Sequence, residues 1–310
     1  MNPDPQFFVG VNLPWLQYGC DFGANPWQPD GGVAQPKRRE RLAEVFGRLA
    51  DRGLTVVRWF MLCDGRAGVR FADDGSVAGL DECFWRDLEA GVEEAGRHRL
   101  SLVFTLFDFR WWRRRRWIEG ARCGGHRHAT SSTARRDALL ERVVGPILSR
   151  CGQEPAIIAW DIVNEPEWVT PGYGTVNPIA GMRSSAMREF IGECASRVHQ
   201  QTRHLATVGL ASWRGLKLVK GLGLDIYQVH WYDRRDRRAP LDAPIAEGLD
   251  RPLWLGEYPT TGSNRTVDEI LDTARHAGYA GALAWSAEAG DRFSGPLPKG
   301  SGQWPVVSDQ

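Results

Sequence analysis

The feature of this sequence that most constrains its fold is a regular alternation of short apolar runs with longer amphipathic stretches. Amphipathic stretches with the 3.6-residue period of a helix cover 38–53, 81–97, 134–150, 184–200 and 266–278, with shorter ones near 213–221 and 242–248. The runs between them are rich in β-branched and aromatic residues, and their near-continuous apolar character is typical of parallel strands covered on both faces. These eight predicted strands lie at 7–13, 54–60, 100–107, 156–163, 205–210, 224–230, 252–257 and 279–285.

Eight strands joined by helical crossovers are what a (β/α)8 barrel requires, and 310 residues are enough for one. The rival architecture is a doubly wound open sheet, which usually carries a glycine-rich phosphate-binding turn after its first strand. The first run leads instead into Asn12-Leu13-Pro14-Trp15, and no linker divides the chain. We therefore expect an α/β fold, a single-domain (β/α)8 TIM barrel over residues 1–310. The barrel is expected to span about 7–290, followed by an irregular Gly- and Pro-rich tail at about 291–310.

Polar and aromatic side chains stand at the ends of the predicted strands, where barrels of this kind assemble their active sites. In AIIAWDIVNEPEW (156–168), an apolar run ends in Asn164, Glu165 and Pro166. A carboxylate at such a tip is costly to desolvate, although a solvated or salt-bridged Glu is an alternative for this tip taken alone. The other strand ends supply Arg58, Asp108, His230, Tyr232, Glu257 and the pair Trp285-Ser286.

Glu165 and Glu257 follow the fourth and seventh predicted strands, which face each other across an eight-stranded ring. Two carboxylates on opposite sides of a pocket are the apparatus for cleaving a glycosidic bond. One must be protonated to give its proton to the leaving oxygen, and the other must stay ionised. Arg58 beside one carboxylate would hold that group charged, because an opposite charge lowers the pKa of an acid. The pair predicts a glycosidase that hydrolyses O-glycosyl bonds.

The strand-end motifs resemble those of the clan A glycoside hydrolases, most closely the family 5 cellulase-like enzymes. The resemblance extends from the first strand to Trp285. It rests on Arg in VRWF, Asn-Glu in VNEP, His-x-Tyr in VHWYD, Glu in LGEY and Trp-Ser in LAWS. NEP alone is a weak signal, but five motifs in the right order, each at a strand end, form a specific one.

The resemblance implies a role for each matched residue. Glu165 corresponds to the acid/base and Glu257 to the nucleophile that forms a glycosyl-enzyme intermediate, with retention of configuration and a separation of about 5 Å. Of the supporting residues, Asn164 resembles the donor to the substrate 2-hydroxyl, Arg58 and Tyr232 the groups that hold Glu257, His230 the residue near the acid/base, and Trp285 the platform beneath the sugar.

Two further expectations follow from the resemblance. The family often has a cis peptide after the Trp that corresponds to Trp285. Many members also carry a His near the end of the third strand, whereas this chain reads Phe107-Asp108-Phe109. Asp108 is therefore expected either to take over part of that contact or to leave the first sugar held differently.

The chain contains 14 Trp residues, which suggests a surface for stacking on flat ligand faces. Trp111 and Trp112 lie in the loop after the third strand, on the catalytic face, and are candidates for substrate contact together with Trp15 and Trp168. Core packing is the alternative for each of them.

The run RWWRRRRW (110–117) has three interpretations: a nucleic-acid patch, a solvated loop, or a groove wall whose arginines grip sugar hydroxyls or an acidic sugar. A formal net charge of +1 disfavours binding to nucleic acid or to an anionic membrane, so neither is expected as a partner. The segment CGGHRH (123–128) lacks the further ligands of a zinc site, so we expect no metal and no cofactor.

The first predicted strand begins near Phe7, which leaves no room for a signal peptide, and no apolar run reaches the length of a membrane span. The six cysteines form no CxxC pair. We expect reduced thiols and a cytoplasmic location, although a secreted protein whose leader has been removed would have the same sequence.

The sequence thus predicts a retaining β-glycosidase that acts on a β-linked glucan, mannan or related oligosaccharide by double displacement. An exo-acting β-glucosidase or β-mannosidase is the alternative within the same class. A non-catalytic carbohydrate-binding barrel is the alternative from another class, and the presence of both Glu165 and Glu257 argues against it. The sequence leaves the sugar, the endo or exo mode of action and the oligomeric state open.

Overall fold

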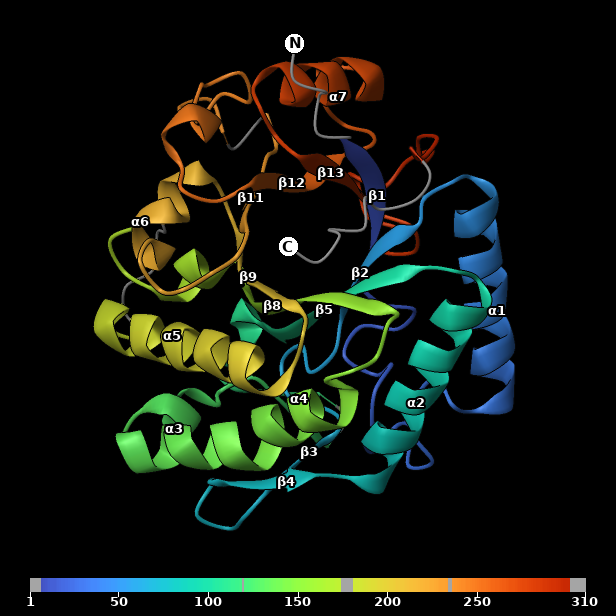
Figure 1. The fold of residues 1–310 in the computed structure, drawn as a ribbon. Helices are drawn as coiled ribbons and strands as arrows, with labels where there is room; N and C mark the ends of the chain where they lie inside the picture. Colours follow the sequence, from blue (N-terminus) through green and yellow to red (C-terminus); the bar gives the residue numbers. More distant parts are fainter. Residues whose placement is uncertain (1–6, 119, 174–180, 234–235, 302–310) are drawn as a thin grey trace.

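The structure is a computed structural model, and it describes residues 7–118, 120–173, 181–233 and 236–301. Its main feature is a parallel sheet of nine strands in the order β10-β11-β12-β13-β1-β2-β5-β8-β9. Viewed along its axis, the sheet forms a ring with helices around it (Figure 1). In chain order the strands are β1 (Phe8–Leu13), β2 (Val56–Phe60), β5 (Ser101–Asp108), β8 (Ile157–Asn164), β9 (Leu205–Thr207), β10 (Gly209–Leu210), β11 (Tyr227–His230), β12 (Leu253–Pro259) and β13 (Gly281–Trp285).

The two ends of this sheet are halves of one strand, because only Val208 separates β9 from β10. β9 pairs with β8, while β10 pairs with β11. The backbone N–H of Glu165, just after β8, also donates to Gly209 O at 2.6 Å. The nine strands therefore make an eight-membered closed barrel, which confirms the predicted fold class and agrees with all eight predicted strand positions.

The helices cover the outside of this ring (Figure 1). Each main helix connects two neighbouring strands, which is the right-handed crossover arrangement of parallel sheets. They are α1 (Pro36–Asp51), α2 (Glu82–Arg97), α3 (Thr133–Leu139), α4 (Gly145–Cys151), α5 (Ser184–Gln201), α6 (Leu216–Val219) and α7 (Val267–His276), with a π-helical turn η3 (Leu140–Val144) joining α3 to α4. The two weak helical predictions correspond to the single turn α6 and the 3-10 turn η7 (Ala246–Gly248).

Local sequence explains where these helices begin and which face they bury. Pro36 starts α1, the Asp81 side chain accepts from Phe84 N at the start of α2, and Thr266 forms a capping box with Glu269 at the start of α7. The apolar stripe of α1 is buried against the barrel as its periodicity predicts, through Leu42, Val45, Phe46 and Leu49.

The remaining turns and strands lie in the connections. The link from β2 to α2 contains a hairpin of β3 (Val69–Phe71) and β4 (Val77–Leu80). After β5 come the turn η1 (Phe109–Trp111), a hairpin of β6 (Arg116–Ile118) and β7 (Ala121–Cys123), and the turn η2 (Arg127–Thr130). The turn η4 (Pro166–Val169) follows β8, and η6 (Trp213–Gly215) precedes α6.

Residues 286–301 form no helix or strand and run back along the barrel. Gly300 N donates to Arg52 O, and Ser301 Oγ accepts from Val9 N, so this segment reaches the start of the first strand. The rest of the predicted tail, 302–310, lies outside the described residues. Among the helices that the structure describes, none has the length and apolar character needed to cross a membrane.

Candidate active site

The ends of the strands surround a cavity of about 360 Å³, within the usual range of ligand pockets. Eight of the residues predicted from sequence line it: Trp15, Asp108, Asn164, Glu165, Trp168, Tyr232, Glu257 and Trp285. Arg58 and His230 are almost completely buried and contact the two glutamates. The structure thus brings together residues from strands that are far apart in the sequence.

Arg58, on β2, organises the charged groups of the site. Its guanidinium donates to Asp161 Oδ2 at 2.6 and 2.8 Å, to Asn12 Oδ1 at 2.9 Å, to Glu257 Oε1 at 2.9 Å and to Asn164 Oδ1 at 2.8 Å. Arg58 and Asp161 have no exposed surface, so each needs the other's charge. The planar guanidinium thus fixes the ends of β1 and β8 relative to the Glu257 carboxylate.

Glu257, on β12, has a donor on each carboxylate oxygen. Arg58 donates to Oε1, and the Tyr232 hydroxyl donates to Oε2 at 2.9 Å. Burial raises the pKa of Glu257, and the nearby Glu165 adds to the rise, whereas His230, Arg58 and Tyr232 oppose it. These three neighbours stabilise the ionised carboxylate in a site that would otherwise disfavour it.

Glu165 follows β8 directly and has an unusual backbone conformation. Its φ and ψ are 47° and 52°, in the left-handed region, which costs a non-glycine residue about 1 kcal/mol or more. The N–H bonded to Gly209 O holds this conformation. The side chain accepts from Trp168 Nε1 at 2.6 Å through Oε2, while its Oε1 lies 3.1 Å from His230 Nδ1.

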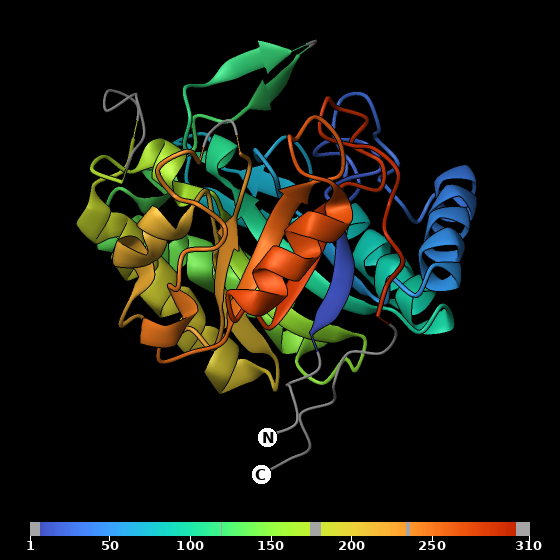
Figure 2. The same cartoon turned by 90° about the horizontal axis from the view of Figure 1, so that it is seen from above.

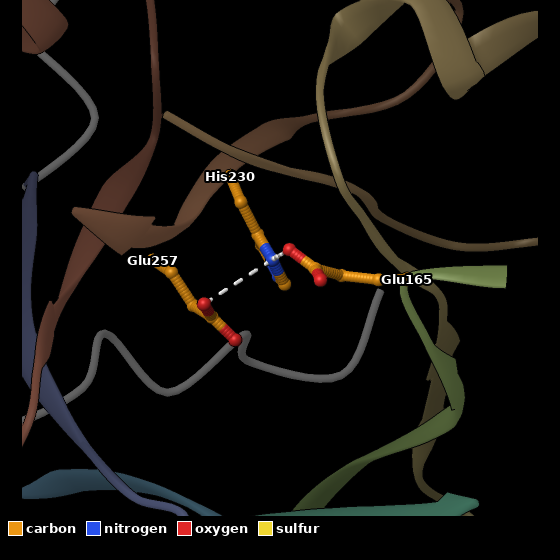
Figure 3. Close-up of side chains that lie close together, drawn as sticks. All are labelled: Glu165, His230 and Glu257. Carbon is orange, nitrogen blue, oxygen red and sulfur yellow. Dashed lines mark hydrogen bonds and ion pairs between the residues drawn. The ribbon is translucent and has the colours of Figure 1, made fainter. Parts of the chain in front are cut away.

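The two glutamates approach from opposite sides, with the His230 imidazole between them (Figure 3). His230 Nδ1 lies 3.1 Å from Glu165 Oε1 and 3.4 Å from Glu257 Oε2. A carboxylate oxygen of each glutamate and a nitrogen of His230 lie within 4.8 Å of one another. A proton on Nδ1 therefore faces both carboxylates, and the gap between them matches the separation of about 5 Å in retaining glycosidases.

Asp108, at the end of β5, lies beside the amide of Asn164. Asn164 Nδ2 donates to Asp108 Oδ2 at 2.8 Å, and Arg110 N donates to Oδ1 at 2.9 Å. Burial raises the pKa of Asp108 to about 7 and Glu165 adds to the rise, although the bonds from Asn164 and Arg110 oppose it. Asp108 thus lines the cavity at the end of β5, the position near which many members of the similar family carry a His.

The peptide bond between Trp285 and Ser286 is cis, as the resemblance implies. The Trp285 indole lines the cavity and donates to Asp291 Oδ2 at 3.0 Å. Trp15 packs edge-on against it, with ring centroids 6.0 Å apart. Both rings therefore present fixed apolar surface at the mouth of the barrel.

Comparison with known proteins places this site in context. No protein-family model matches the chain. Over 324 aligned residues the chain is 24% identical to the mannan endo-1,4-beta-mannosidase of Mytilus edulis. This alignment covers 90% of this chain and 83% of that protein. The endo-1,4-beta-mannanase structure from Eisenia fetida is similar with a TM-score of 0.77 at 21% identity, covering 95% of this chain and 88% of that one.

A family 5 glycoside hydrolase (GH5_18) from Streptomyces cattleya, solved in complex with Manb1-4GlcNAc, has a similar fold with a TM-score of 0.65. It is 11% identical, and the match covers 94% of this chain and 74% of that one. The chain is a glycoside hydrolase that resembles the clan A, family 5 enzymes. The solved structures show the shared fold, while the sequence match and the strand-end motifs agree on the glycosidase activity.

Two aromatic predictions for this hydrolase are wrong. Trp111 and Trp112 have no exposed surface and are absent from the cavity lining. Trp111 packs edge-on against Phe107, and Trp112 packs against Phe107 and Phe190, so both belong to the core beneath the loop. The turn η1 directs them inward, which the sequence of the loop alone does not reveal.

The CGGHRH segment also packs rather than forming a separate metal site. The His126 ring stacks on Phe71 with centroids 4.4 Å apart, and burial lowers its pKa to about 3. Among the residues described, one group has the geometry to hold a metal ion, and it consists of Glu165, His230 and Glu257. Those ligand atoms are the same ones that the carboxylate chemistry of the hydrolase requires.

Several residues of the site were missed by the sequence analysis. Asp161 had a usable signal, since an acid within an apolar strand needs a buried partner. Glu167 lies under the loop after β10, fully buried, and burial raises its pKa to about 8. Tyr18 lines the cavity from the loop after β1, where no periodicity fixes the direction of a side chain. Arg110 and Arg113 also line it, and they belong to the run 110–117, for which a groove wall was one of the three interpretations.

Proposed function

We propose that this hydrolase cleaves β-1,4-mannan internally, with retention of configuration, using Glu257 as the nucleophile and Glu165 as the acid/base. The observation that carries the proposal is the unequal environment of two carboxylates within 4.8 Å of each other. Glu257 accepts from a guanidinium and a phenol, which favour its ionised form, whereas Glu165 accepts from the Trp168 indole.

In the first step, a Glu257 oxygen attacks the anomeric carbon as the bond to the leaving oxygen breaks. Glu165 gives its proton to that oxygen, and the donors on Glu257 keep the attacking carboxylate in position. The products are the leaving sugar and a glycosyl ester of Glu257. Two consecutive inversions at the same carbon then give net retention.

In the second step, the ionised Glu165 takes a proton from water as the water oxygen attacks the anomeric carbon. The ester bond to Glu257 breaks, and both glutamates return to their starting states. His230 faces both carboxylates throughout and holds them in a fixed relation. The indole of Trp285 at the cavity wall offers an apolar face for the sugar at the cleavage point.

The mannan substrate and the internal mode of cleavage are supported by the relatives. The similar proteins from Mytilus edulis and Cryptopygus antarcticus are both mannan endo-1,4-beta-mannosidases, and each aligns over nine tenths or more of this chain. An exo-acting β-mannosidase or β-glucosidase is the alternative.

The test is digestion of β-1,4-mannohexaose labelled at its reducing end, with the lengths of the products and their anomeric configuration followed over time. Internal cleavage gives several product lengths at once, whereas an exo enzyme releases monosaccharide from the start.

We expect Glu257→Ala to lower kcat by at least about 10³-fold and azide to restore turnover with an inverted product. Glu247→Ala, an exposed glutamate in η7, is the matched control and should retain full activity. Full activity of Glu257→Ala would refute the assigned role.

A further inference from the structure

The loop after β5 lines one wall of the catalytic cavity with two arginines, Arg110 and Arg113. Their charges are balanced differently. Arg110 Nε lies 3.8 Å from Asp108 Oδ1, so this guanidinium has an acidic partner. Arg113 has no ion pair with any described residue, and its guanidinium lies 4.6 Å from the centre of the Phe109 ring. A guanidinium remains charged at every physiological pH, so Arg113 presents to the cavity a cation that has no ion-pair partner among the described residues.

Arg113 follows β5, which pairs with β8 as far as Asp108 and Asn164, so it lies on the side of the cavity that contains Glu165. Burial lowers its pKa and the neighbouring Arg110 adds to the decrease, whereas attraction to Asp108 and Glu165 opposes it. In the proposed mechanism Glu165 protonates the leaving oxygen, so groups on its side of the cavity contact the leaving-group sugars. The cation therefore faces the part of the chain that departs in the first step.

The positive charge continues outward from the cavity. Arg114, Arg115 and Arg116 follow directly, and all three are exposed. Their segment leads into the β6–β7 hairpin, which projects from the barrel (Figure 2) and includes Trp117, 62% exposed. We call Arg110 and Arg113–Arg116 the cationic wall. A chain with a net charge of only +1 concentrates five arginines here.

We propose that the cationic wall recognises a carboxylate carried by the mannan chain on the leaving-group side of the cleaved bond. This inference rests on the proposed function. The planar guanidinium fork matches a carboxylate in bidentate geometry, and an anion there would meet a cation that forms no ion pair with the described residues. It would also offset the repulsion that an acidic substrate experiences from the ionised Glu257.

A carboxylated glycan fits this arrangement better than a nucleic acid. The cationic wall begins inside the cavity that contains the two catalytic glutamates, so its ligand must bring a glycosidic bond and an anion into the same space. Trp117 at the outer end offers an apolar face on which a sugar ring of the same chain can stack.

The experiment compares neutral β-1,4-mannan with the same mannan partly oxidised to carboxylates at C6. We expect a higher kcat/KM for the oxidised chain in 20 mM salt, and a preference that shrinks as NaCl is added. Arg113→Gln should lower the ratio of the two kcat/KM values by roughly three- to tenfold. Arg251→Gln is the matched control, because this exposed arginine precedes β12 at the opposite end of the barrel.

Mass analysis of the products gives a second readout that loss of folding cannot imitate. Carboxylated residues should accumulate near the newly formed non-reducing ends, which come from the leaving-group side, and this enrichment should vanish in Arg113→Gln. Equal cleavage of both substrates by the wild type would overturn the inference and leave the proposed function intact. Cleavage of neither would overturn both. Inhibition by a DNA duplex together with equal cleavage would assign the cationic wall to nucleic acid instead.

Discussion

At the scale of single residues, the site depends on which hydrogen bonds a carboxylate receives. Glu165 and Glu257 have the same kind of side chain, and both are almost fully buried, but their neighbours differ. Arg58 and Tyr232 donate to Glu257, while Trp168 donates to Glu165. The division of labour between the two acids is thus set by the donors around them.

The Tyr232 hydroxyl provides a direct test of this argument. Tyr232→Phe removes one donor from the Glu257 carboxylate and leaves the ring in place. A hydrogen bond to a charged group contributes about 1.5–3 kcal/mol, so we expect kcat to fall roughly 10- to 100-fold. Steady-state kinetics would measure it, with Tyr227→Phe as control. Tyr227 is the first residue of β11, at the end of the barrel opposite the active site, and its hydroxyl donates to Asp250. Loss of this hydroxyl should therefore leave kcat unchanged.

At the scale of elements, the connections after the strands decide which side chains reach the cavity. The joint between β8 and η4 contains Glu165 and, two residues later, Glu167. Glu167 Oε2 accepts from Ala211 N at 3.1 Å, and a Cβ at Gly215 would lie 1.9 Å from Oε1. The close fit of this loop over Glu167 buries the carboxyl group and favours its neutral form.

Glu167 should therefore make stability depend on pH. Burial raises its pKa to about 8 in the folded state, above the unfolded value of about 4.3. Between these values the folded state binds more protons, so the free energy of unfolding falls as pH rises and levels off above about pH 8, by up to about 5 kcal/mol. Urea unfolding from pH 5 to 9 should show a smaller decrease for Glu167→Gln. An identical decrease in both proteins would show that Glu167 ionises freely.

The buried tryptophans of the loop after β5 belong to the same scale. Trp112 is fully buried and donates to Thr130 Oγ1 at 3.0 Å, whereas Trp117 is 62% exposed on the hairpin. We expect Trp112→Ala to lower the free energy of unfolding by about 3–5 kcal/mol. Trp117→Ala should change it by less than about 0.5 kcal/mol. Denaturant unfolding of both variants measures this difference, and similar losses would contradict the packing described.

At the scale of the whole molecule, the sequence predicted the barrel well because its signals are local. Each strand shows its apolar run, each helix its period, and the acids at the strand ends follow from the topology. The direction of loop side chains could not be predicted, because it depends on contacts between distant segments. Trp111 and Trp112 are buried by Phe107 and Phe190, and Glu167 by the loop after β10.

The cysteines provide a prediction for the molecule as a whole. All six are free, and five are buried, while Cys83 is partly exposed at the surface of α2. We expect a thiol reagent to modify one cysteine in the folded protein and six after denaturation, with Cys83→Ser abolishing the native reaction. Two or more fast-reacting thiols in the folded protein would be inconsistent with this burial.

The closure of the barrel through Val208 has a consequence for association between copies of the chain. A ring of strands has no terminal strand with unpaired N–H and C=O groups onto which another polypeptide could add. Among the described residues, the strands left with such groups belong to the two hairpins, and they are three or four residues long. Damage that displaces β9 and β10 would leave unpaired edges on β8, which is eight residues long, and on β11, which is four, so the short segment around Val208 protects both strands from pairing with another chain.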